Sequence, residues 1–346
     1  MKHQTTRYGE IPFYKIGTFG NTADAFISKK LFLEYKTKYS FPKKGDILIS
    51  ASGTIGRAVI YDGKPAYFQD SNIVWIDNDE TLVKNDFLFY AYSNVKWNTE
   101  HTTILRLYND NFRNTLIPLP PLNEQNAIAN ILSALDRYLC ALDALILKKE
   151  GVKKALSFEL LSQRKRLKGF NQAWQRVRLG DIANYSTSNL SVEQITQQGK
   201  IKVYDVNNFI GYTDTTFISD KPYISIIKDG SVGRVRILPP KTNILSTMGA
   251  LIANHRTTTE FLFYLLSNFD FKNFTSGSII PHIYFKDYKE KTIFLPPLNE
   301  QSAIANILSD LDNEITSLKN KKRQFENIKK ALNHDLMSAK IRVLKK

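Results

Sequence analysis

Cysteine is almost missing from this chain. Cys140 is the single cysteine among 346 residues, which excludes an internal disulfide and fits a reducing compartment. No apolar run approaches the roughly 20 residues that a membrane-spanning helix needs, and the first residues lack the apolar stretch of a signal peptide. We therefore expect a cytoplasmic protein with no membrane partner, in which Cys140 is a small packing residue on a helix.

Catalytic motifs are missing as well. The sequence has no G-x-x-x-x-G-K-[ST] phosphate loop and no Asn/Asp-Pro-Pro-Tyr/Phe/Trp motif of amino-methyltransferases. Its five histidines and one cysteine show no metal-ligand spacing. We therefore expect no metal site, no cofactor and no catalytic residue in this chain, and no enzyme activity by the chain alone.

Positive charge is what the sequence has in excess. It contains 48 Lys and Arg against 33 Asp and Glu, a net charge of +15, with 42% hydrophobic residues that indicate a folded protein. Such a charge attracts polyanions, and nucleic acid is the leading candidate. A solvated basic surface explains the charge equally well, so the charge alone leaves both interpretations open.

One segment occurs twice. LPPLNEQNAIANILSALD begins at Leu119, and LPPLNEQSAIANILSDLD begins at Leu295, 176 positions later, with 16 of 18 residues identical. A weaker match links SGTIGR at 52–57 with DGSVGR at 229–234. Because the period is too long for a solenoid, the pattern indicates two similar halves that keep a framework while the residues between have diverged.

Two kinds of segment alternate along the chain. Residues 9–117 and 176–293 mix short apolar runs with turns, as in α+β domains of about 100 residues. A double proline ends each, and a long proline-free segment follows. Its apolar residues recur at spacings of 4, 3, 4, 3, which is typical of a coiled-coil seam. The seam residues are Ile128, Leu132, Leu135, Leu139, Leu142 and Ile146, then Ile304, Leu308, Leu311, Ile315 and Leu318.

The sequence therefore predicts an α+β fold with a pseudo-two-fold internal repeat. Two globules would be separated by two long helices that form an antiparallel coiled coil, which places the globules at opposite ends of a rod. Two separate helical hairpins are the alternative. The predicted boundaries are 1–117 for the first globule, 118–168 for the first helix, 169–293 for the second globule and 294–346 for the second helix.

These segments carry a family resemblance. LPPLNEQ opening a long helix twice, the SGTIGR turn, and the segment from Trp174 to Ile182 together resemble the specificity (S) subunit of type I restriction–modification enzymes, over almost the whole chain. The resemblance implies that each globule is a target-recognition domain that reads one half of a split double-stranded DNA sequence. It also implies that the helices set the gap between the half-sites and dock two methyltransferase (M) subunits, which restriction (R) subunits then join. S-adenosylmethionine, ATP and magnesium would belong to those partners.

Candidate DNA contacts lie on the repeated turn and near the prolines. Glycines allow close approach of a phosphate, and arginine can bind a phosphate or a guanine edge with two hydrogen bonds. A changed basic residue beside a kept tyrosine fits a reading position. The candidates are Lys43, Lys44, Ser52, Thr54, Arg57, Arg106, Tyr108, Lys221, Lys228, Ser231, Arg234, His282 and Tyr284. A purely structural turn, core tyrosines and solvated lysines remain open.

The residues that open the long helices form a second candidate set. Asn123 and Asn299 are expected to cap the helices, and the next residue of each places a negative charge near the positive end of the helix dipole. The resemblance adds a role near the M-subunit interface, for which the candidates are Glu124, Gln125, Glu300 and Gln301.

The first half departs from the repeat in one respect. The second globule has a lead-in, residues 174–185, whereas Gly9 already aligns with Gly199, so the given sequence shows no matching lead-in for the first globule. Two explanations stay open: the true start lies upstream, or the first recognition domain is incomplete at its N-terminus. Two alternatives follow for the function. The chain could be a truncated or silent S-subunit copy, or a scaffold that binds M subunits without reading DNA. It could also be a general basic DNA-binding protein without sequence preference.

Overall fold

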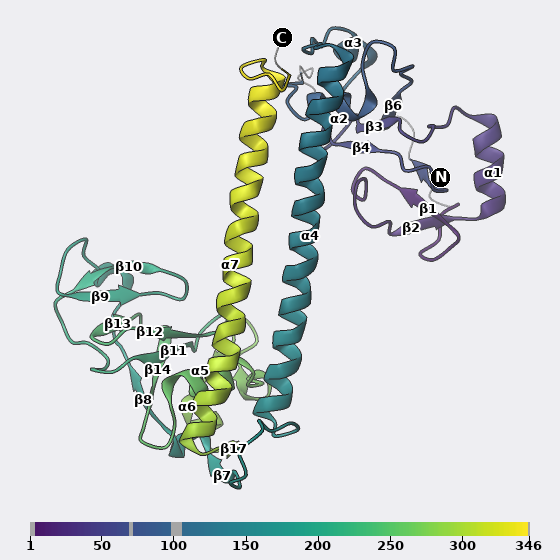
Figure 1. The fold of residues 1–346 in the computed structure, drawn as a ribbon. Coiled ribbons are helices and arrows are strands. Elements are labelled where there is room, and N and C mark those ends of the chain that lie inside the picture. Colours follow the sequence, from purple (N-terminus) through teal and green to yellow (C-terminus); the bar gives the residue numbers. More distant parts are fainter. Residues whose placement is uncertain (1–3, 69–71, 98–105, 345–346) are drawn as a thin grey trace. The chain divides into compact units, whose positions relative to one another are not determined.

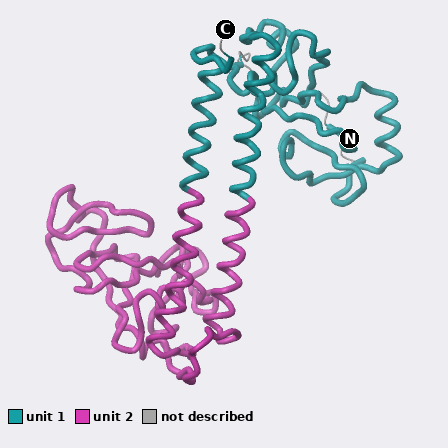
Figure 2. The backbone as a smooth tube through the Cα atoms, viewed as in Figure 1, with its two compact units in different colours: residues 1–143, 320–346 teal, residues 144–319 magenta. Residues whose placement is uncertain are grey.

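The computed structural model describes residues 4–68, 72–97 and 106–344. The chain divides into two compact units, shown in Figure 2: unit 1 contains residues 1–143 and 320–346, and unit 2 contains residues 144–319. Each unit contains one globule and part of both long helices. The boundary between the two units falls within the segments 118–168 and 294–346.

Unit 1 contains two three-stranded sheets, with strand orders β2-β1-β5 and β4-β3-β6 (Figure 1). Its elements are β1 (Ile11–Tyr14), β2 (Ala25–Ile27), α1 (Lys29–Lys38), β3 (Ile47–Ser50), β4 (Ala58–Ile60), β5 (Tyr67–Phe68), β6 (Ile73–Ile76), α2 (Asn85–Tyr92) and α3 (Asn109–Arg113). The central strand β3 is apolar on both faces. Ile47 and Ile49 pack with Leu88 of α2, while Leu48 packs with Phe19 and Tyr61.

Unit 2 contains sheets of orders β10-β9-β13 and β12-β11-β14-β8, and the two-stranded pairs β17-β7 and β15-β16. Its elements are β7 (Gln175–Arg178), η1 (Leu179–Asp181), β8 (Ala183–Thr187), η2 (Val192–Gln194), β9 (Ile201–Tyr204), β10 (Phe209–Thr213), β11 (Tyr223–Ile227), β12 (Val235–Leu238), β13 (Thr242–Ile244), β14 (Met248–Ala253), α5 (Thr259–Ser267), η3 (Lys272–Phe274), β15 (Thr275–Ser276), β16 (His282–Ile283), α6 (Phe285–Tyr288) and β17 (Thr292–Leu295).

The two globules share one topology. In the first sheet, β1 and β9 each have one antiparallel and one parallel neighbour. In the second sheet, β3 and β11 each lie between two antiparallel strands. The internal repeat is thereby confirmed. The lead-in forms β7 and most of β8, and these strands have no counterpart among the described residues of unit 1.

The long helices are α4 (Leu122–Leu161) and α7 (Leu298–Met337), each of 40 residues. Within each unit, of two ion pairs between the helices, the one with the higher-numbered residue of α4 has the lower-numbered residue of α7. The two helices are therefore antiparallel, as predicted. The pairs are Asp136–Lys329 and Asp143–Lys322 (2.7 Å) in unit 1, and Asp312–Lys153 (2.5 Å) and Glu314–Lys149 (2.8 Å) in unit 2. The seam leucines Leu132 and Leu308 are fully buried.

Each globule is fastened to the helix pair at a matched point. Tyr90 of α2 donates a hydrogen bond to Asp136 in unit 1 (2.7 Å), and Tyr264 of α5 donates one to Asp312 in unit 2 (3.0 Å). Cys140 of α4 is exposed, so its expected packing role is wrong. Among the described helices, none is long and apolar enough to cross a membrane.

Candidate DNA interface

Two loops meet at one end of the central strand in each globule. In unit 2, an isolated bridge joins Asp229, just after β11, to His282, the first residue of the short strand β16. The backbone N–H of Gly230 donates to the carbonyl of Pro281 (2.9 Å), which holds the two loops together. We call Asp229 and His282 the bridge site of unit 2.

The same bridge occurs in unit 1. Ser52 pairs with Arg106, and the N–H of Leu107 donates to the carbonyl of Ala51 (2.8 Å). The Ser52 hydroxyl also donates to Asn72 (2.7 Å). Ser52 and Arg106 are the bridge site of unit 1, so one backbone arrangement presents different side chains in the two units.

The bridge site of unit 2 combines charge with an aromatic surface. His282 Nδ1 lies 2.6 Å from Asp229 Oδ1, and both side chains are partly exposed. The Lys228 ammonium lies 3.7 Å from the same carboxylate. The ring of Tyr284 stacks beside His282 at 6.4 Å, and Lys286 lies 5.5 Å from the Tyr284 ring centroid. Such a cluster can donate to and accept from base edges and attract phosphate.

Sequence reasoning missed Asp229. A carboxylate draws no attention in a search for basic DNA contacts, and its bridge to His282 spans 53 residues. The available signal was that Asp229 opens the repeated turn opposite Ser52.

The two repeated tyrosines are surface residues. Tyr108 is 46% exposed and Tyr284 is 49% exposed, so the core alternative is wrong for both. Each lies two residues after its bridge-site partner, Arg106 or His282, as the sequence pattern predicted. Both are therefore available as flat contact surfaces.

The four glycines of the repeated turn differ in how closely other atoms surround them. A Cβ on Gly56 would lie 2.3 Å from Trp97 Nε1, and one on Gly233 would lie 2.7 Å from the Phe271 ring, so both are needed for packing. Gly53 and Gly230 also have positive φ, of 69° and 84°, but a Cβ on Gly53 would make only an ordinary contact with Ile16 (3.6 Å), and a Cβ on Gly230 would contact no atom within 4 Å. The structural interpretation of the turn therefore holds for Gly56 and Gly233. Gly53 and Gly230 leave the backbone accessible to a phosphate.

The arginines of the turn are exposed but anchored. Arg57 donates to the carbonyl of Phe19 (2.9 Å), and Arg234 donates to the side chain of Asn207 (3.0 Å). Arg236, which sequence reasoning missed, donates to the Asn207 carbonyl (2.9 Å) and lies 5.3 Å from the Tyr204 ring. These contacts tie the turn to the first sheet of each globule. Thr54 and Ser231 lie exposed on the same turns.

Three predicted lysines lie away from the bridge sites. Lys43 and Lys44 precede β3 and Lys221 precedes β11, whereas the bridge residues follow these strands. At about 3.4 Å per residue, the five-residue β11 separates Lys221 from Lys228 by roughly 17 Å or more. Lys43 is paired with Asp77 (3.2 Å). The structure thus does not join these three to the cluster.

The candidate partner contacts lie in the interior. Glu124, Gln125, Glu300 and Gln301 are at most 3% exposed. Gln125 donates to the carbonyl of Pro120 (2.8 Å), and Gln301 donates to that of Pro296 (2.8 Å), so each locks the helix start to its globule. A role of these four at an M-subunit interface stays a prediction that this burial does not support.

The helix starts differ slightly from the expectation. Both helices begin one residue before the asparagine, so Asn123 and Asn299 lie inside the first turn and are not the caps. Each accepts a hydrogen bond from the N–H of the following glutamate, at 3.0 and 2.9 Å. A hydrogen bond from Arg342 lowers the pKa of the Glu124 carboxyl. Within the described part of the chain, no three His, Cys, Asp or Glu side chains gather as a metal site.

Two globules of one topology, with unlike bridge sites, define a recognition protein of repeated design. The sequence model of the family "Type I restriction modification DNA specificity domain" matches residues 1–149 and 171–327. The chain belongs to this family, which confirms the resemblance seen in its motifs.

Individual relatives agree. The chain is 65% identical over 133 residues to a putative type I restriction enzyme specificity subunit, S.HindORF215P, of Haemophilus influenzae; this match covers 38% of the chain and 34% of that protein. It is 28% identical over 335 residues to the putative type I restriction enzyme MjaX specificity subunit of Methanocaldococcus jannaschii. This match covers 86% of the chain and 79% of that protein. The crystal structure of a type I restriction–modification S subunit from M. genitalium shares the fold, with a TM-score of 0.64 and 21% identity. The match covers 97% of this chain and 91% of that chain.

Proposed function

We propose that this chain is the DNA-recognition subunit of a type I restriction–modification complex and reads an asymmetric, two-part DNA target. The bridge site carries this proposal, because the same backbone bridge holds Arg106 beside a buried Ser52 in unit 1 but the partly exposed Asp229 and His282 in unit 2. Arginine suits guanine, whereas a carboxylate accepts from the amino group of cytosine. Two target-recognition domains that share one fold but carry different bridge-site side chains predict two different half-sites.

Phosphate contacts would supply the affinity that places the readers. The net charge of +15 favours a polyanion, and Gly230, around which no atom would contact a Cβ within 4 Å, lies beside the bridge site of unit 2. Arg57 and Arg234 are exposed on the same turns and would bind the DNA backbone there.

The catalytic chemistry belongs in this proposal to other subunits. Two M subunits would dock on the chain and methylate adenine with S-adenosylmethionine, and R subunits would add ATP- and magnesium-dependent cleavage. The family to which the chain belongs supports this division of roles. The chain itself would contribute recognition, and we expect it to act in the cytoplasm.

A silent S-subunit copy is the second candidate. The observation that favours it is that the described residues of unit 1 form a three-stranded sheet β4-β3-β6, whereas the matching sheet of unit 2 has four strands. Such a copy would bind M subunits without productive reading.

Methylation mapping separates these candidates. The chain would be co-produced with its M subunits, and methylated adenines would be located by sequencing the DNA of the host. We expect one two-part motif with unlike halves. M subunits that bind the chain but leave the DNA unmethylated would establish the silent copy. Methylation without a motif would indicate general basic DNA binding and contradict both.

A further inference from the structure

The hairpin that carries His282 in unit 2 exposes two isoleucines in succession. Its strands β15 and β16 pair antiparallel, and its turn contains Ile279, which is 92% exposed, and Ile280, which is 54% exposed. We call these two residues the hairpin tip. Neighbouring isoleucines that face water indicate a contact surface, because water solvates aliphatic groups poorly.

The backbone around the hairpin tip is held by short-range contacts. Gly277 has a positive φ of 91°, and a Cβ there would overlap a carbonyl oxygen of the tip, so the turn requires a glycine. The N–H of Gly230 donates to the carbonyl of Pro281 (2.9 Å), and the N–H of Ile283 donates to that of Lys228 (2.9 Å). The hairpin is thereby fastened to the loop that follows β11.

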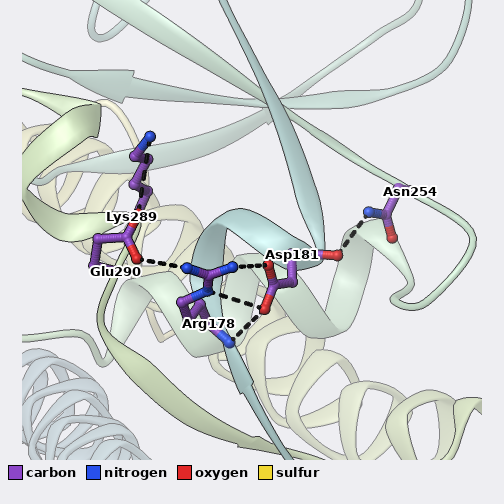
Figure 3. Close-up of polar contacts among 5 residues, drawn as sticks. All are labelled: Arg178, Asp181, Asn254, Lys289 and Glu290. Carbon is purple, nitrogen blue, oxygen red and sulfur yellow. Dashed lines mark hydrogen bonds and ion pairs between the residues drawn. The ribbon is translucent and has the colours of Figure 1, made fainter.

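The chain that follows the hairpin is anchored as well (Figure 3). Glu290, two residues after α6, pairs with Arg178 of β7 (3.0 Å), which also pairs with Asp181 (3.4 Å). The Asn254 amide donates to the Asp181 carbonyl (3.0 Å). The hairpin and α6 are therefore held on both sides, and these contacts fix where the tip is presented.

The hairpin tip adjoins groups that suit DNA. Only Pro281 separates it from His282 of the bridge site. The cations Lys228 and Lys286 and the half-exposed ring of Tyr284 belong to the same cluster. Cations beside hydrogen-bonding side chains match the phosphates and base edges of DNA. Because the tip is continuous with this cluster, a duplex that covers the cluster covers the tip too.

The hairpin tip can reach the bases next to those at the bridge site. At no more than about 3.6 Å per residue, Ile279 lies within roughly 11 Å of His282. Successive base pairs are about 3.4 Å apart, so this reach spans about three of them. The apolar group that base edges offer in the major groove is the 5-methyl group of thymine. Aliphatic side chains among base edges therefore favour thymine.

We propose that Ile279 and Ile280 are specificity-determining residues that contact the 5-methyl group of thymine in the half-site read by unit 2. This inference rests on the proposed function and deepens it, because it names a base that the half-site contains. The thymine lies within about three base pairs of the one at the bridge site.

The test uses uracil, which pairs as thymine does but lacks the methyl group. The complex of the chain with its M subunits would bind duplexes that carry the mapped motif, with each thymine of the motif replaced in turn by uracil. We expect the replacement to weaken binding about fourfold at one or two positions of one half, as for the loss of one buried methyl group. Fluorescence anisotropy titrations at one fixed salt concentration measure this change.

Chain variants assign the effect to the hairpin tip. Ile279→Ser combined with Ile280→Ser should weaken binding to the thymine duplex and abolish the sensitivity to uracil. Ile279→Val combined with Ile280→Val keeps aliphatic groups there and should retain the sensitivity. Phe294→Ser is the matched control, because Phe294 of β17 is 51% exposed and lies outside the hairpin. All four chains, the unsubstituted one included, should bind M subunits equally.

Three results would overturn the inference: no effect of uracil at any position, a serine variant that keeps the sensitivity, as a wedge between base steps would, or a serine variant that loses M subunits, which would make the tip a protein contact. In each case the unsubstituted complex still methylates its motif, so the proposed function stands. A complex that methylates no motif would end the proposed function and this inference together.

Discussion

Single residues decide what each globule can recognise, because the backbone around them is kept. The bridge between the two loops occurs in both units, yet it carries Ser52 and Arg106 in one and Asp229 and His282 in the other. Arg106 offers donors alone, whereas the Asp229–His282 pair offers an acceptor and a ring that donates or accepts. The difference in hydrogen-bonding chemistry is confined to side chains, which makes it testable by substitution.

His282→Arg places the unit 1 side chain at the matched position of unit 2. We expect the methylated motif to change in one half and stay the same in the other, because a base contact is worth about 1–3 kcal/mol of discrimination. Methylation mapping of the reconstituted complex measures this change. Lys221→Ala, at the far end of β11, is the control and should keep the motif. An unchanged motif with His282→Arg, in a complex that still methylates, would remove His282 from base reading.

The helices and strands were the part of this structure that the sequence predicted best. The prolines and the 4, 3, 4, 3 spacing predicted a long helix within residues 118–168, and α4 spans Leu122–Leu161. The mixture of short apolar runs and turns in residues 9–117 and 176–293 likewise predicted α+β domains, and both segments contain strands and helices. The isolated bridge could not be predicted, since contact between Asp229 and His282 depends on how two loops fold onto one strand end. The caps were misplaced because Leu122 itself enters the helix.

The ends of the helix pair in unit 1 should respond to acid. Arg342, just after α7, binds the Glu124 carboxylate in the first turn of α4, and this hydrogen bond lowers the pKa of Glu124 from its ordinary 4.5. A lowered pKa contributes stability that is complete above pH 4.5 and is lost as the pH falls through the lowered value. Arg342→Met should therefore lower the free energy of unfolding at pH 7 and reduce its loss below pH 4.5.

Urea unfolding followed by circular dichroism from pH 3 to pH 7 measures both effects. Arg113→Met is the matched control, because the Arg113–Asp110 pair is 76% and 81% exposed and should contribute little. An acid profile of Arg342→Met that overlays that of the unsubstituted chain would show that the Glu124 contact does not link folding to pH.

Whole-molecule organisation was predicted in part. The repeat showed that the chain has two halves, and the boundary between the two compact units falls within both long helices. The reason is that a helix of 40 residues buries one part of its seam beside one globule and the rest beside the other. The globule of unit 2 is nevertheless closed by its own strand pair, since β7 near its start pairs with β17 at its end.

Exchange of residues 176–293 for the matching globule of another family member tests this modular design. Both junctions lie within the β7–β17 pair, beside Gln175 and Leu295, and Trp174 stays with the helix start through its bond to Glu300. The exchanged chain should therefore fold and bind M subunits, and one half of the methylated motif should change while the other half and the gap stay constant. Methylation mapping of both complexes gives the comparison. A change in both halves would mean that the units do not read DNA independently, and a change in the gap alone would place target reading outside this globule.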